Sequence, residues 1–288
     1  MTRLVTPLLV KDLRERTGLG MMECKRALVT CSGDIDEAIA MLRKSSGLKA
    51  AKKSTRTAAD GSIGVASSDD YGVIVEVNSE TDFAARDDNF QGFVKDVLEA
   101  AFDTQETELV ALRANNRLEE KRNALIQKIG ENILLRRFKS LKAPVVGSYL
   151  HSNRRIGVVV GLTGGSSELA RQVAMHVAAV NPAVVRSEDM LESVLAAEKE
   201  IYLAQARDSG KPEQIIQKMV AGRVAKFLKE SSLIDQPFVK DPDKTIGQLV
   251  AEANADVTTF IRFEVGEGII KEEVDFATEV AAQIEKIG

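Results

Sequence analysis

The sequence predicts a multidomain α+β protein. Three observations carry this prediction: helical patterns open the chain, two strand–turn–strand–helix units follow, and a long helical stretch interrupts the second unit. The length of 288 residues suits two or more domains, and 44% hydrophobic with 28% charged residues is typical of a globular chain. We expect a three-helix domain with a basic linker (1–55), a first core subdomain (56–141), a second core subdomain (142–183 with 231–265), an inserted antiparallel helical hairpin (184–230) and a C-terminal helical module (266–288).

The first segment reads as three short helices. Apolar spacing predicts helices at 8–16 and 21–30, with glycines ending each of them. A third helix begins at Asp34, where Glu37 three positions later gives a capping-box arrangement. Residues 49–60 are polar and basic, so we expect a linker there.

An internal repeat follows the linker. Each copy has two strand patterns and then a helix, at 61–63, 71–75 and 90–102 in the first copy and at 147–149, 156–160 and 169–180 in the second. Antiparallel strands with a helix on one face predict two duplicated subdomains. Between the copies, leucine and isoleucine spacing predicts a longer helix at about 118–141.

The second unit is interrupted by a helical pair. Helices at 187–206 and 213–229 flank a strong turn at 208–212, which predicts an antiparallel hairpin. Strand-like residues then resume: 236–239 is extended, 245–253 is helical and 257–265 is a strand. The tail at 274–287 has the pattern of an amphipathic helix.

Composition narrows the functional classes. The net charge of -4 argues against broad nucleic-acid binding. We interpret two local basic clusters as linker and solvated helix face, with RNA or an acidic partner as the alternative; they are Lys49, Lys52, Lys53 and Arg56, and then Arg136, Arg137 and Lys139.

From the sequence we expect neither export nor membrane insertion. No basic region leads into an apolar run at the N-terminus, so we expect no signal peptide, and no stretch nears the roughly 18 apolar residues of a membrane span. Cys24 and Cys31 lie seven positions apart on one helical pattern, roughly 10 Å along the axis, which is too far for a disulfide. These features fit a reducing cytoplasm.

Catalytic and metal chemistry find little support in the sequence. The two histidines are far apart: His176 lies among alanines and valines, which favours a core role, and His151 lies in a turn, where it is a candidate partner contact. The glycine-rich segment 161–167 lacks the lysine of a P-loop, so a tight turn is the better interpretation. We therefore expect no catalytic residue, metal site or cofactor. The sequence favours a binding or regulatory protein over an enzyme.

The segment 79–86 holds the most informative residue. It follows a buried strand pattern at 72–77 and precedes a helical one, so it forms a turn. Phe83 stands there among polar neighbours, with no apolar side chain bulkier than Ala84 beside it. Chemistry alone leaves two alternatives open: the ring is tucked under the turn, or it is offered to a partner.

The chain resembles the elongation factor Ts family along nearly its whole length. The resemblance rests on segments 13–18 with 20–22, Glu80-Thr81-Asp82-Phe83, Lys128-Ile129-Gly130-Glu131-Asn132, Gly147-Ser148-Tyr149, Gln236-Pro237-Phe238-Val239 and 260–268. One departure is Ala84, where the family commonly has valine. The resemblance implies an N-terminal bundle like the ubiquitin-associated (UBA) fold, a two-part α+β core, a hairpin and a C-terminal helical module.

The resemblance also implies a function and a set of contact residues. Family members are guanine-nucleotide exchange factors for the GTPase elongation factor Tu, acting without covalent chemistry. In them the aromatic wedges between two helices of the GTPase and disturbs its Mg²⁺ and phosphate site. Carried over, the Mg²⁺-dislocation motif is Thr81, Asp82, Phe83 and Ala84, and the secondary contacts are Ile129, Gly130, His151, Met21, Met22 and Val239. An RNA- or ribosome-associated protein is the alternative, and the hairpin could pair with a second copy.

Overall fold

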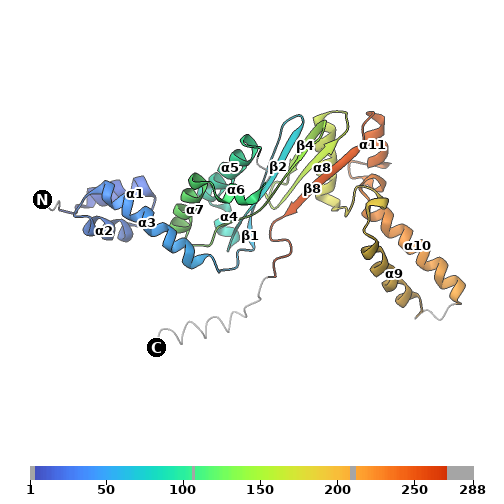
Figure 1. The fold of residues 1–288 in the computed structure, drawn as a ribbon, viewed down its shortest axis with the longest axis horizontal. Coiled ribbons are helices and arrows are strands. Elements are labelled where there is room, and N and C mark those ends of the chain that lie inside the picture. Colours follow the sequence, from blue (N-terminus) through green and yellow to red (C-terminus); the bar gives the residue numbers. More distant parts are fainter. Residues whose placement is uncertain (1–3, 106–107, 208–211, 271–288) are drawn as a thin grey trace.

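The computed structural model describes residues 4–105, 108–207 and 212–270 of the chain. The protein is elongated, with a helical bundle at one end, a central core of sheets and helices, and a two-helix arm at the other end (Figure 1). The predicted class, a mixed α+β protein with small antiparallel sheets, is confirmed.

The N-terminal bundle consists of α1 (Pro7–Thr17), α2 (Met21–Thr30) and α3 (Ile35–Lys53). Gly18 ends α1 in the left-handed region at φ 68°, and the Asp34 carboxylate caps α3 by accepting from the Glu37 amide at 2.9 Å. The predicted linker from residue 49 is wrong at its start, because α3 continues to Lys53. The bundle therefore reaches the central core on a continuous helix.

The first sheet has the order β1-β2-β3, all antiparallel. Its elements and the helices on its outer face are β1 (Asp60–Ser67), β2 (Tyr71–Ser79), α4 (Asp82–Arg86), α5 (Asp88–Asp103), α6 (Leu109–Arg113), α7 (Asn116–Ile129) and β3 (Leu134–Lys142). The helix predicted to run from about 118 to 141 is wrong in its second half. It ends at Ile129, Gly130 follows at φ 87°, and the chain returns as β3.

The second sheet has the order β4-β5-β8, also antiparallel. Its elements and their neighbours are β4 (Val145–Leu150), β5 (Ile156–Leu162), α8 (Ser167–Val180), a short pair β6 (Pro237–Phe238) and β7 (Asp241–Thr245), α11 (Ile246–Glu252) and β8 (Val257–Glu264). Residues 163–166 form the turn from β5 into α8, within the segment 161–167 for which the sequence predicts a tight turn.

The two sheets pack face to face through a shared apolar layer. This layer includes Ile63, Ile74, Val159 and Phe263. Each sheet presents a glycine to the other: a β-carbon on Gly72 would lie 2.5 Å from Val159, and one on Gly157 would lie 2.4 Å from Ile63. The glycines of the two repeated strands thus allow the sheets to approach closely.

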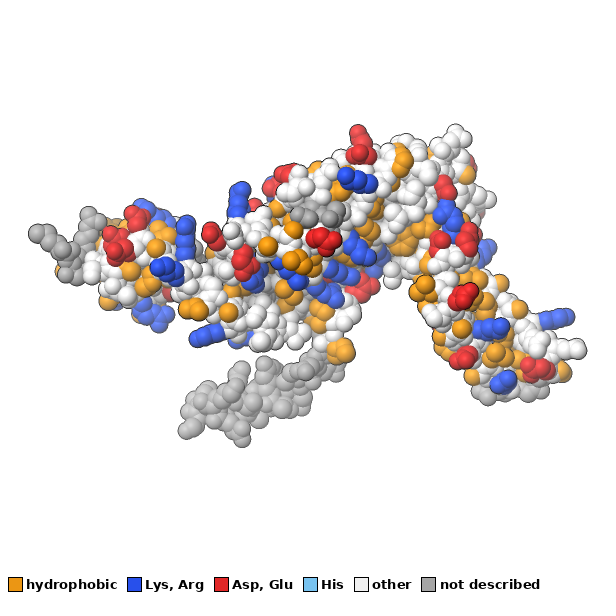
Figure 2. Space-filling model, in the orientation of Figure 1, with side chains coloured by type: hydrophobic (Ala, Val, Ile, Leu, Met, Phe, Trp, Pro, Cys, Tyr) orange, Lys and Arg blue, Asp and Glu red, His pale blue; other side chains and the backbone are white. Residues whose placement is uncertain are grey.

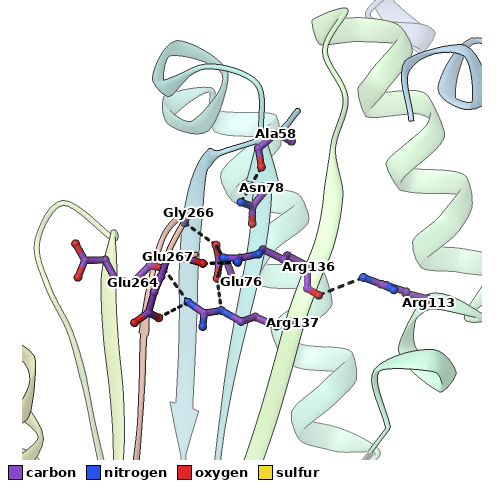
Figure 3. Close-up of polar contacts among 9 residues, drawn as sticks. All are labelled: Ala58, Glu76, Asn78, Arg113, Arg136, Arg137, Glu264, Gly266 and Glu267. Atoms are coloured by element: carbon purple, nitrogen blue, oxygen red, sulfur yellow. Dashed lines mark hydrogen bonds and ion pairs between the residues drawn. The ribbon is translucent and has the colours of Figure 1, made fainter. Parts of the chain in front are cut away.

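A buried ion cluster joins the sheets at one edge (Figure 3). The Glu76 carboxylate, fully buried, accepts from Arg136 at 3.0 Å, from Arg137, and from the Gly266 amide at 2.9 Å. The Arg137 guanidinium also donates to the Glu264 carbonyl at 2.8 Å and lies over the Phe263 ring at 4.1 Å. Arg136 and Arg137 are therefore paired residues of β3, and the expectation of a solvated helix face is wrong for them.

The arm is formed by α9 (Glu192–Arg207) and α10 (Glu213–Ser231), after a short 3-10 turn at Ser187–Asp189 and before another at Leu233–Asp235. The helix predicted from Ser187 thus begins later, at Glu192. Most of the predicted turn at 208–212 and the predicted tail helix at 274–287 lie outside the described residues. Hydrophobic side chains are scattered among charged ones along the arm (Figure 2), and its pairing with a second copy stays a prediction.

Candidate functional site

Phe83 is displayed on the surface of a short, well-anchored turn. It is the second residue of α4, and its side chain is 80% exposed. The Thr81 hydroxyl caps this helix by accepting from the Ala84 amide at 3.2 Å, while Ala84, only 5% exposed, and Ala85 face the interior. Of the two alternatives left by the sequence, the tucked ring is wrong, because Phe83 is exposed; that the ring is offered to a partner stays a prediction.

Asp82 and Arg86, on either side of Phe83 in the sequence, line a pocket. Asp82 accepts from Arg86 at 2.8 Å in an ion pair with both side chains partly exposed. This pocket of about 450 Å³ is also lined by the β4–β5 turn. Two arginines of that turn are tied to the first unit, since Arg154 donates to Gln91 and Arg155 donates to Asp60.

His151 begins that β4–β5 turn. Its side chain is exposed, and Nδ1 lies 3.2 Å from the Tyr149 hydroxyl. The turn lines the same pocket as Asp82, so the structure brings the neighbourhood of His151 toward α4. His151 itself is outside the pocket lining.

The loop after α7 is hydrogen-bonded to the start of the turn that carries Phe83. The Glu131 carboxylate accepts from the amides of Glu80 and Thr81, both at 3.0 Å, and from the Thr81 hydroxyl at 2.7 Å. In return the Glu80 carboxylate accepts from the Asn132 amide at 2.6 Å. The two loops are therefore joined by reciprocal carboxylate–backbone hydrogen bonds, which are among the stronger kinds.

Ile129 and Gly130 belong to this same loop. Ile129 is the half-buried last residue of α7, and Gly130 is exposed, with no atom within 4 Å of where a β-carbon would stand. The Gly130 carbonyl accepts from Lys53 at the end of α3. The structure thus places both residues beside the Phe83 turn and next to the chain that leads from the bundle.

The remaining predicted contacts lie on separate elements. Met21 and Met22 are exposed on α2, beside an apolar groove of about 530 Å³. Val239 is exposed in the turn between β6 and β7, and its amide donates to Nδ1 of His176. The bundle and the second sheet's outer elements stand toward opposite ends of the molecule (Figure 1), so a surface including all of these residues would be long.

His176 is a core residue, as the sequence predicts. Because Nδ1 accepts from Val239, Nε2 carries the proton and donates to the Gln236 side chain at 2.9 Å. Burial lowers the pKa of His176, and the hydrogen bond to Gln236 opposes this only in part. The neutral His176 ring thus supports the segment that carries Val239 through its hydrogen bonds to Gln236 and to the Val239 amide.

No group of three or more His, Cys, Asp or Glu side chains within the described ranges could hold a metal ion. Across the same ranges, no helix is long and apolar enough to cross a membrane.

Comparison with known proteins decides the family. The model of the protein family described as "Elongation factor TS" matches residues 80–267 of this chain. The chain belongs to the elongation factor Ts family. Proteins named elongation factor Ts are similar over nearly their whole lengths: 61% identical in Hahella chejuensis (96% of this chain, 97% of the relative), 60% in Saccharophagus degradans (97% and 98%) and 59% in Marinobacter nauticus (96% and 96%). The family is one of translation elongation factors.

Two features of the site refine the expectations from the family resemblance. Ala84 is buried, so the departure from valine lies in the packing under α4 and not on the exposed surface beside Phe83. Glu131 was not predicted as a site residue, although it lies within a segment that carries the resemblance. The signal available in the sequence was an acidic residue directly after a glycine that ends a helix. That signal does not identify the partners of Glu131, which lie about fifty positions away in the sequence.

Proposed function

We propose that this protein is a cytoplasmic guanine-nucleotide exchange factor for elongation factor Tu. The observation that carries the proposal is Phe83, a large apolar ring displayed on an anchored turn, in a chain of the elongation factor Ts family. A lone exposed aromatic held in a fixed direction is suited to act as an anchor in a partner's pocket.

The mechanism we propose requires binding alone. A GTPase holds GDP through backbone amides, a lysine and a Mg²⁺ ion. Insertion of Phe83 between two helices of the GTPase displaces them, and Asp82 supplies a polar contact there. Because packed elements switch between discrete arrangements, a small displacement is enough to open the Mg²⁺ site. The Asp82–Arg86 pair is exposed and therefore weak, so Asp82 can exchange it for a partner contact.

Linkage then completes the cycle. If the bound factor lowers the affinity of the GTPase for GDP by some factor, bound GDP lowers the affinity of the GTPase for the exchange factor by the same amount. The factor is therefore released by the incoming nucleotide, and no covalent step or cofactor is needed.

The other proposed contacts extend this surface. Thr81 and Ala84 frame the motif, Ile129 and Gly130 add contacts next to it, and the second-rank candidates His151, Met21, Met22 and Val239 would widen the footprint. We also propose that the bundle is UBA-like, that the two sheet–helix units are duplicated subdomains, and that the C-terminal segment is a helical module.

The test is release of fluorescent GDP from elongation factor Tu, followed by stopped flow with and without this protein. Large acceleration supports the proposal. No acceleration would refute it and favour the alternative, an RNA- or ribosome-associated protein, which predicts binding that falls steeply with salt. That alternative has lost part of its basis, since Arg136 and Arg137 are committed to the buried Glu76.

A further inference from the structure

The turn that carries Phe83 depends on contacts from outside its own segment. The helix α4 has five residues, too few to be stable alone. Phe83 is 80% exposed, so almost no packing orients its ring. The direction of the ring is therefore set by the backbone of residues 80–82, and the question is what fixes that backbone.

The Glu131 carboxylate accepts three hydrogen bonds from this segment, while the Ser79 hydroxyl adds one by donating to the Thr81 carbonyl at 2.9 Å. One carboxylate oxygen accepts from two consecutive amides, those of Glu80 and Thr81. The other carboxylate oxygen accepts from the Thr81 hydroxyl. Because the hydroxyl proton points to Glu131, a lone pair of the hydroxyl oxygen is free to accept from the Ala84 amide and so to cap α4. A single side chain thus holds the entry to α4 and orients its cap.

The loop that presents Glu131 is itself held in place. Asn132 donates its amide to Glu80 at 2.6 Å and its side chain to the Arg56 carbonyl at 2.8 Å. Lys53 donates to the Gly130 carbonyl. Glu131 therefore acts from a fixed support that includes the end of α3, and the turn is not merely resting on a mobile loop.

We propose that Glu131 is a positioning residue for exchange: it holds the Phe83 turn rigid, so that insertion of the ring displaces the helices of the partner and does not displace the turn. The inference rests on the proposed exchange function. A turn that must become ordered during insertion adds its ordering cost to the step in which the ring enters. In this proposal the second-rank contacts His151, Met21, Met22 and Val239 carry the encounter, so that cost should fall on the maximal rate and leave half-saturation alone.

The test uses the full chain and compares Glu131→Ala with Glu131→Gln. Glutamine keeps an oxygen for both backbone amides and an amide group that reaches the Thr81 hydroxyl, so it should restore most of the function. The charge control is Glu99→Ala, which removes an exposed carboxylate that pairs with Lys95 on the same helix. GDP release is measured against factor concentration, so that the maximal rate and the half-saturating concentration are separated.

We expect Glu131→Ala to lower the maximal rate about tenfold with half-saturation changed less than twofold, and Glu131→Gln to stay within about threefold of the wild type. In a Phe83→Ala background, Glu131→Ala should add little, because the two residues act through one step. Amide hydrogen exchange without any partner should show Glu80 and Thr81 losing protection in Glu131→Ala.

Two results of the exchange assay would overturn the inference while the proposed function stands: wild-type-like exchange by Glu131→Ala, or a loss that adds in full to that of Phe83→Ala, as general destabilisation would. Unchanged amide protection in Glu131→Ala would also overturn it, whatever the exchange assay gives. Failure of the wild type to accelerate release would instead overturn the proposed function, and with it the role of Glu131.

Discussion

Replacing Phe83 with alanine tests the wedge most directly. An aromatic residue buries about 150–250 Å² on leaving water, and Phe83 is 80% exposed in the free protein. About 160 Å² is then available for burial against a partner, worth up to about 4 kcal/mol at roughly 25 cal/mol per Å². Alanine keeps the β-carbon, so we expect a loss of about 2–4 kcal/mol, or roughly 100-fold in the rate that depends on insertion.

The assay is stopped-flow release of fluorescent GDP from elongation factor Tu at saturating factor. Because the ring packs against almost nothing in the free chain, the substitution should change the free energy of unfolding by no more than about 0.5 kcal/mol. Val110→Ala is the matched control, since it truncates another exposed apolar side chain, on α6.

A stable Phe83→Ala variant that releases GDP as fast as the wild type would refute the wedge. The search would then move to Asp82, Ile129 and Gly130. An equal loss in Val110→Ala would also refute the reasoning, because it would show that exposed apolar area in general, and not this ring, drives the step.

Three further predictions concern stability. Glu76→Ala leaves Arg136 and its neighbour without their buried anion, so it should cost about 3–5 kcal/mol in chemical denaturation. Since burial lowers the pKa of His176, unfolding takes up a proton below the ordinary value of about 6.5; stability should fall by up to about 1.4 kcal/mol per unit as pH drops through that value, and less in His176→Asn. Asp87→Ala removes the cap of α5, which accepts from the Asn89 amide at 2.8 Å, and should cost about 0.5–2 kcal/mol in the same assay. The Asn89 side chain lowers the pKa of Asp87, so this difference should disappear as pH falls below about 3.9.

The sequence predicted most helices and five of the six strands in the two core sheets, but it mistook β3 for a helix. Leu135, Phe138 and Leu141 recur every third position, which is the helical pattern. In the structure a bulge opposite Glu76 and Val77 shifts the register, so Leu135 and Phe138 face the same core although their spacing is odd. Leu141 faces the other sheet. The bulge and the change of face together give β3 an apolar spacing like that of a helix. The bulge can be recognised only when the pairing with the neighbouring strand is known.

For the candidate site, the sequence located the Phe83 turn but could not determine the exposure of the ring. Turn position follows from the local pattern of strand and helix, whereas exposure depends on what the rest of the chain places beside the turn. The contact between Thr81 and Glu131 joins residues 50 positions apart, through a loop whose course depends on where α7 ends. Because the predicted helix continued to 141, that loop was absent from the prediction, and its role was absent with it.

The rigidity of the turn bears on how exchange would proceed. When a ring is forced between two helices, whichever side is softer yields, and a soft turn would fold back and leave the nucleotide site of the GTPase closed. Here the entry to α4 is held by a carboxylate that accepts three hydrogen bonds, its support is tied to the end of α3, and its inner face is closed by Ala84 and Ala85. In the proposed mechanism, the partner therefore bears the strain of insertion. By linkage, the same strain would make the loaded GTPase a poorer ligand than the empty one, so the proposed rigidity at Glu131 and the proposed exchange at Phe83 would be two parts of one mechanism.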